Sequence, residues 1–163
     1  MLKKIQILAS IFILPVILSI VIIWQIKLIQ KSKTDYNLSG GKVENFGFTN
    51  KNVKGSYKSP TTETKVFFIK LSNNDTIYSF FFRREYKYNF LISNLKQNDY
   101  VKIYNKGFTK RQNTVDIIQL EKGQKVLIDK NISDRRHYVL VAFLTLILFL
   151  YFFLPYKFIW KKR

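Results

Sequence analysis

Few residues in this chain have the type and spacing that catalysis requires. There is one histidine, His137, and no cysteine, which excludes thiolate chemistry and cysteine-based zinc sites. No P-loop, G-x-S-x-G or H-E-x-x-H motif occurs, and the acidic residues are scattered singly. Ser56 and Lys58 have the types of a nucleophile and its base, but their segment is rich in Gly, Ser, Asn and Pro and would not hold them in hydrogen-bond reach. We therefore expect a protein that is not an enzyme, with no catalytic residue, metal or cofactor.

Basic and aromatic residues form a better candidate site. They gather in two expected loops, residues 49–62 and 105–113. Cations beside exposed rings can follow a polyanion backbone and stack its bases. The candidate polyanion-binding residues are Lys51, Lys54, Tyr57, Lys58, Lys106, Phe108, Lys110 and Arg111. The alternative interpretation is that these are ordinary solvated loop charges.

A second basic set flanks two uncharged apolar segments, residues 5–26 and 138–156. About 20 such residues cover the hydrocarbon core of a bilayer, so both segments are expected to be transmembrane helices. The first has no A-x-A-like cleavage site after it, which favours an uncleaved signal anchor. The candidates for contacts with lipid head groups are Lys27, Lys31, Lys33, Lys130, Arg135 and Arg136.

The two spans divide the chain into seven expected parts. They are a basic N-terminal tail (1–4), a first span (5–26), a stalk (27–39), a β-rich domain (40–129), a return linker (130–137), a second span (138–156) and a basic C-terminal tail (157–163). The net charge is +18, of which the segment between Lys31 and His137 carries +11. Such a domain favours anionic partners: lipid head groups, nucleic acid or acidic polymers.

Between the spans, the hydrophobic pattern predicts a small β-domain with one helix. Strand-like runs occupy residues 42–48, 65–71, 76–82, 99–104 and 114–120, with a further run at 125–129. Tyr88, Leu91, Ile92 and Leu95 are spaced as one face of a short helix. Five strands with a helix between the third and fourth is the order of an OB-fold, although an SH3-like or open sheet gives a similar pattern. The expected fold is a membrane-anchored α+β protein in which two transmembrane helices flank an OB-like barrel.

This layout resembles uncharacterised bacterial two-span membrane proteins with a small all-β domain between the spans. The resemblance rests on Gly41-Lys42-Val43, on Asn-Asp-Tyr-Val-Lys-Ile-Tyr at 98–104, and on Ile-Gln-Leu-Glu-Lys-Gly-Gln-Lys-Val at 118–126. It implies architecture only and brings no catalytic residues to this chain.

The sequence therefore predicts a non-catalytic integral membrane protein whose basic β-domain is a binding or scaffolding module for an envelope or membrane partner. The alternative is a membrane-tethered module that binds a polyanion or nucleic acid. The expected location is a bacterial inner or plasma membrane, with both termini cytosolic. Long connecting domains translocate largely regardless of charge, whereas the compact basic tail should stay inside. The spans are expected to pack as a hairpin through small residues such as Ser19 and Thr145.

Overall fold

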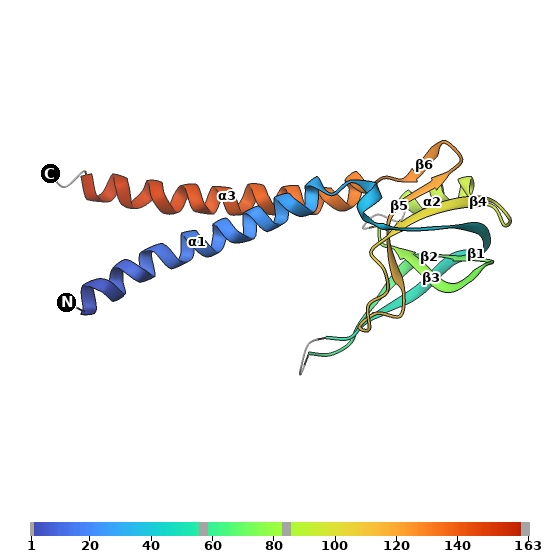
Figure 1. Cartoon of the computed structure of the whole chain (residues 1–163), viewed down its shortest axis with the longest axis horizontal. Coiled ribbons are helices and arrows are strands. Elements are labelled where there is room, and N and C mark those ends of the chain that lie inside the picture. The colour runs from blue at the N-terminus through green and yellow to red at the C-terminus, as the bar shows by residue number, and fades with distance from the viewer. Residues whose placement is uncertain (1, 56–58, 83–85, 161–163) are drawn as a thin grey trace. The chain divides into compact units, whose positions relative to one another are not determined.

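The computed structural model describes residues 2–55, 59–82 and 86–160. The described elements, in chain order, are α1 (Leu2–Gln30), the 3-10 helix η1 (Lys33–Asp35), β1 (Asn37–Val53), β2 (Thr62–Leu71), β3 (Asn74–Phe80), α2 (Tyr86–Asn94), β4 (Tyr100–Asn105), β5 (Val115–Lys122), β6 (Lys125–Ile128) and α3 (Lys130–Trp160) (Figure 1). They form two compact units. Met1–Lys31 and Asn131–Arg163 make up a helical unit, and Ser32–Lys130 make up a β-domain.

The helical unit consists of α1 and α3. Both helices are long and apolar enough, by length and composition, to cross a membrane. Both also extend beyond the apolar segments, since α1 continues to Gln30 and α3 begins at Lys130. The expected return linker, 130–137, is therefore helical, and the expected stalk, 27–39, is divided among α1, η1 and β1.

A polar contact joins the two helices of this unit. Gln25 is 6% exposed, and its side-chain oxygen lies 2.6 Å from Nδ1 of His137. Thr145, which we expected at the contact between the spans, is exposed on α3, and its pairing with Ser19 stays a prediction.

The β-domain contains a six-stranded sheet in the order β3-β2-β1-β4-β5-β6, in which neighbouring strands are antiparallel. A short parallel pairing also joins β3 to β5, through Tyr78 with Val115 and Ser79 with Asp116. The expected six strands and single short helix between β3 and β4 are confirmed. The strand boundaries differ most at β1.

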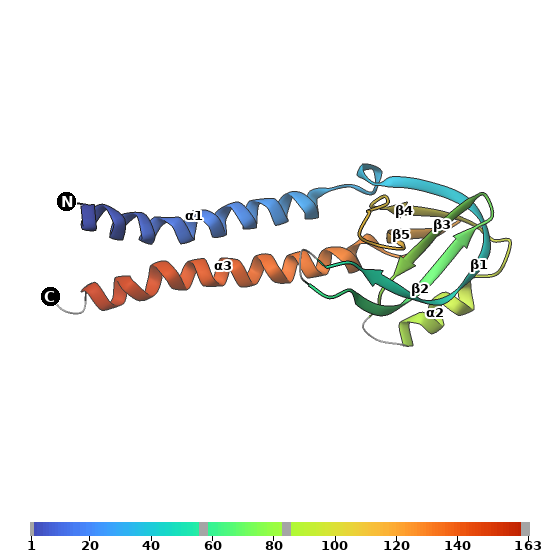
Figure 2. The same ribbon diagram turned by 90° about the horizontal axis from the view of Figure 1, so that it is seen from below.

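β1 is much longer than the expected strand at 42–48, and it pairs with two other strands. Its first part, from Asn37 to Lys42, pairs with β4, and the part from Val43 to Val53 pairs with β2. The register shifts between Val43 and Asn45, as at a β-bulge, which bends a strand. Figure 2 shows β1 turning back on itself. Gly41 lies inside β1, and a Cβ there would come 2.5 Å from Oδ1 of Asn73.

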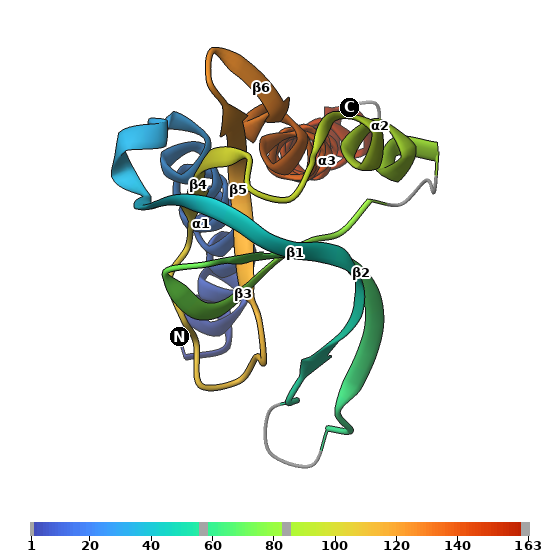
Figure 3. The ribbon, with the colours of Figure 1, turned by 90° about the vertical axis from the view of Figure 1, so that its right-hand side faces the viewer.

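The expected loop at 49–62 is shorter in the structure, because its first residues continue β1. Thr49 to Val53 pair with Val66 to Thr62 of β2 and extend the two strands as an arm (Figure 3). Hairpin turns lie at 72–73 between β2 and β3 and at 123–124 between β5 and β6. Gly123, in the second of these turns, has a positive φ of +58°.

The core follows the predicted alternation of apolar residues. Alternate apolar side chains of the two predicted runs, 65–71 and 76–82, are at most 8% exposed: Phe67, Ile69, Leu71, Tyr78, Phe80 and Phe82. α2 adds Tyr88 and Leu91 to this core, and the Tyr88 hydroxyl accepts a hydrogen bond from the Phe82 N–H at 2.7 Å. The expectation for Ile92 is wrong, because this side chain is 43% exposed.

Both ends of the β-domain lie at the same end of the sheet. In one row across the sheet, Ser39 pairs with Ile103, Ile103 with Leu120, and Leu120 with Ile128. Neighbouring strands lie about 4.8 Å apart, which places the first and last strands of this row roughly 14 Å apart. The chain therefore begins β1 and completes β6 at nearby points.

Candidate binding surface

The structure brings the two predicted basic loops together. The N–H of Lys54, just after β1, donates to the carbonyl of Arg111 at 2.9 Å, and Val53 forms a β-bridge with Gln112. The Asn113 side chain accepts from the N–H of Asn52 at 2.8 Å and donates to the carbonyl of Asn50 at 3.1 Å. The end of β1 and the end of the β4–β5 loop are thus held as one structure.

The start of the β4–β5 loop is fixed by a buried asparagine. Asn105 is 3% exposed; its amide donates to the Ser39 hydroxyl at 3.2 Å, and its carbonyl oxygen accepts the Gly107 N–H at 2.9 Å. Gly107 has a φ of +79°, and a Cβ on it would lie 2.8 Å from Nδ2 of Asn37. The positive φ favours glycine at this position, and an added Cβ would also require the end of the Asn37 side chain to move.

Phe108 follows this glycine and projects outward. It is 70% exposed, more than any other large hydrophobic residue that the structure describes. Its loop is held at both ends, so the ring is exposed from a fixed base rather than from a free segment. A fixed exposed ring loses little conformational entropy when it binds a partner.

The predicted cations differ in whether they are already paired. Lys51 forms an ion pair with Asp116, and only 13% of its side chain is exposed, so we leave it out of the surface defined below. Lys54, Lys106, Lys110 and Arg111 are exposed and form no ion pair with any residue that the structure describes. Tyr57 and Lys58 lie outside the described residues. We call Lys54, Lys106, Phe108, Lys110 and Arg111 the loop surface.

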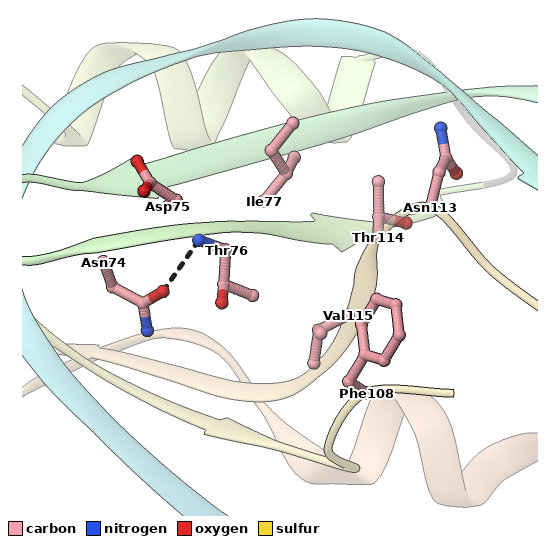
Figure 4. Close-up of a pocket in the computed structure, with 8 residues that line it drawn as sticks. All are labelled: Asn74, Asp75, Thr76, Ile77, Phe108, Asn113, Thr114 and Val115. Atoms are coloured by element: carbon pink, nitrogen blue, oxygen red, sulfur yellow. Dashed lines mark hydrogen bonds between the residues drawn. The ribbon is translucent and has the colours of Figure 1, made fainter. Parts of the chain in front are cut away.

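A pocket of about 310 Å³ lies beside this surface (Figure 4). Its lining comes from Asn74, Asp75, Thr76 and Ile77 on β3, and from Phe108, Asn113, Thr114 and Val115. The Asn74 side chain accepts from the N–H of Thr76 at 2.7 Å, and Thr114 shares a hydrogen bond with Ser79 at 2.7 Å. Because the only charged group in the lining is the Asp75 carboxylate, the pocket does not suit an anion.

Among the predicted lipid-contact residues, Lys33 has a partner within the β-domain. Its Nζ lies 2.8 Å from Oε1 of Glu121 and 5.3 Å from the centre of the Tyr104 ring. The hydrogen bond from Lys33 lowers the pKa of the Glu121 carboxyl, although burial opposes this shift. Lys27, Lys31, Arg135 and Arg136 are exposed, and Lys130 is half-buried.

The residues that build this surface were missed by the sequence reasoning, which identified only its cations and Phe108. Asn105, Gly107 and Asn113 fix the loop without carrying its chemistry. The Asn-Lys-Gly order at 105–107 is a turn signal that could have located the first anchor. Asn113 acts on residues more than 60 positions away, and no local pattern indicates such a contact.

Comparison with protein-family models, curated proteins and solved structures finds no match for this chain. The functional argument therefore rests on the geometry of the loop surface. The resemblance to two-span bacterial proteins stays a prediction.

Proposed function

We propose that this protein is a non-catalytic, membrane-anchored module that uses its loop surface to bind an anionic envelope or membrane partner. The observation that carries the proposal is the fixed convergence of two loops that expose four unpaired cations around Phe108. Lys51, Lys70 and Lys122 of the same domain are paired with carboxylates. Other exposed lysines, such as Lys42, Lys96 and Lys102, lie outside the two converging loops. Charges left unpaired on a fixed base are available to an external anion.

The domain itself is an OB-like barrel in this proposal. The order β3-β2-β1-β4-β5 and the β3–β5 pairing support a closed arrangement of five strands, with α2 between β3 and β4. In OB-folds the loops after strands 1 and 4 flank the ligand-binding face, and these are the loops that meet here. The ligand of such a face is chosen by its loops, not by the fold.

α1 and α3 anchor the module by crossing the membrane, and the β-domain lies outside the cytosol. Their length and composition support two spans, and the start and end of the domain lie close enough together for paired helices. A cysteine at Gln124 tests the orientation, since this residue is exposed on the β5–β6 turn and the chain has no cysteine of its own. We expect an impermeant maleimide to label Gln124→Cys in intact cells. Labelling only after permeabilisation would contradict this orientation.

Binding is tested by removing the unpaired charges from the full-length protein. In Lys106→Gln/Lys110→Gln/Arg111→Gln, we expect loss of the components that co-purify with the wild-type chain from detergent-solubilised membranes. The matched control is Lys42→Gln/Lys96→Gln/Lys102→Gln, which removes the same charge from exposed lysines elsewhere. Equal loss in both variants would show that only net charge matters and would contradict the proposal.

The alternative function is binding of nucleic acid or another polyanion, and the exposed ring of Phe108 among the cations favours it. In that case the chain should be retained on a polyanion column in a salt-dependent manner. The loop variant should reduce the slope of log affinity against log salt by about one unit for each removed cation. The control variant should retain the wild-type slope.

A further inference from the structure

The connections between the β-domain and the helices are short. Six residues, 31–36, separate the end of α1 from the start of β1, and one residue separates the end of β6 from α3. The seven steps from Gln30 to Asn37 cover at most about 25 Å even if fully extended. If α1 and α3 cross a membrane, as proposed above, the end of the sheet that contains Asn37 is held close to that membrane.

The loop surface begins at this same end of the sheet. Asn37 pairs with Asn105, the last residue of β4, and the loop starts at the next residue. Gly107 is so close to Asn37 that an added Cβ would lie 2.8 Å from its side chain. The loop is thus held beside the point where the chain arrives from α1. Its position follows from strand pairing within the domain and from the length of the connecting chain.

The composition of the loop suits the surface of a bilayer. A membrane contact requires an apolar side chain for the boundary between head groups and acyl chains, and cations for anionic head groups. Phe108 supplies the first, and Lys106, Lys110 and Arg111 supply the second. Nucleic acid is favoured less, because stacking of successive bases uses several rings. Phe108 is the only exposed ring among the described residues of this loop.

We propose that residues 106–111 form a membrane-contact loop. Phe108 enters the head-group layer, and Lys106, Lys110 and Arg111 bind anionic lipids of the membrane that holds α1 and α3. This inference rests on the proposed membrane anchoring and names the anionic partner of the loop surface. The helices already hold the domain at the bilayer, so the loop meets the lipid surface at a high effective concentration. A contact made by one ring and three cations is therefore sufficient for the loop to bind the membrane.

The test uses the full chain in nanodiscs of phosphatidylcholine, with or without phosphatidylglycerol. Phe108→Cys and the control Gln124→Cys each carry an environment-sensitive fluorophore at a single cysteine. At position 108 we expect quenching by spin-labelled lipid and iodide quenching on the order of threefold weaker than at position 124. Phosphatidylglycerol should increase this protection. Adding Lys106→Gln/Lys110→Gln/Arg111→Gln to Phe108→Cys should remove that increase.

Three outcomes would overturn the inference. If the chain enters nanodiscs but positions 108 and 124 are equally open to iodide in both lipid compositions, the membrane contact is wrong and the anchoring stands. If position 108 is protected only when a single-stranded oligonucleotide is added, the partner is nucleic acid. If the chain does not enter nanodiscs, the proposed anchoring and this inference both fail.

Discussion

The cations near the two ends of β4 differ in whether they contact polar groups of the same domain. At the end where β4 begins, Lys122 contacts Asp99 and the carbonyl of Asn94, and Lys125 contacts the Asn94 side chain. At the end where β4 finishes, Lys106, Lys110 and Arg111 have no ion-pair partner among the described residues. Lys51 of β1 is paired with Asp116 at this second end, so the difference lies in the cations at 106–111 themselves. We call the first region the paired end; we expect it to stabilise the fold, and we propose that residues 106–111 bind a partner.

The largest expected effect comes from breaking the paired end. Lys122→Met removes the cation that contacts Asp99 and the last turn of α2. Hydrogen bonds to charged groups contribute about 1.5–3 kcal/mol, and we expect a loss of that size in the free energy of unfolding. Chemical denaturation of the detergent-solubilised chain measures it. Lys102→Met, at an exposed lysine of the neighbouring strand β4, should change the free energy of unfolding by less than about 0.5 kcal/mol.

A smaller effect is expected from changing the base of the loop surface. Gly107→Ala places a Cβ against Asn37 and strains a positive φ, so we expect a cost of about 1–3 kcal/mol and a displaced loop. Gly123→Ala is the matched control, because φ is also positive there but nothing lies within 4 Å. It should cost about 1 kcal/mol without affecting binding. Equal loss of binding in both variants would contradict a fixed loop base.

Acid should weaken the paired end before it affects the loop surface. The hydrogen bond from Lys122 lowers the pKa of the Asp99 carboxyl, against the effect of burial, and Lys33 does the same for Glu121. In the unfolded chain these carboxyls have pKa values of about 4. The two ion pairs therefore stabilise the fold above that pH, and this stabilisation is lost as the pH falls through the lower pKa values of the folded chain. Thermal unfolding between neutral pH and pH 3 measures this loss. In Asp99→Asn, the unfolding temperature should depend less on pH. An unchanged pH dependence would contradict the stabilising role of the Asp99 carboxylate.

The smallest expected effect on stability belongs to the loop cations. Lys106→Gln/Lys110→Gln/Arg111→Gln removes no ion pair with a described residue, so the free energy of unfolding should change by less than about 0.5 kcal/mol for each site. The same variant should lose binding to the anionic partner. A destabilisation as large as that of Lys122→Met would show that these cations are structural.

Much of the fold could be predicted from local sequence patterns. The loop surface could be predicted only in part. The hydrophobic pattern located the six strands and the short helix α2. The second half of β1 was missed because its polar side chains are mostly not buried, and it is held by backbone pairing with β2. The pairing of Lys51 with Asp116 joins residues 65 positions apart, so no spacing rule could separate this lysine from the unpaired cations.

The central claim is that the unpaired cations face an anionic partner in the membrane, and lysine reactivity tests it on the unmodified chain. Acetylation of each lysine, followed by mass spectrometry, is compared between nanodiscs that contain phosphatidylglycerol and neutral detergent micelles. We predict that Lys106 and Lys110 react more slowly in the nanodiscs, while Lys42 and Lys102, also exposed, react at unchanged rates. Equal rates for all four lysines in both environments would contradict the account.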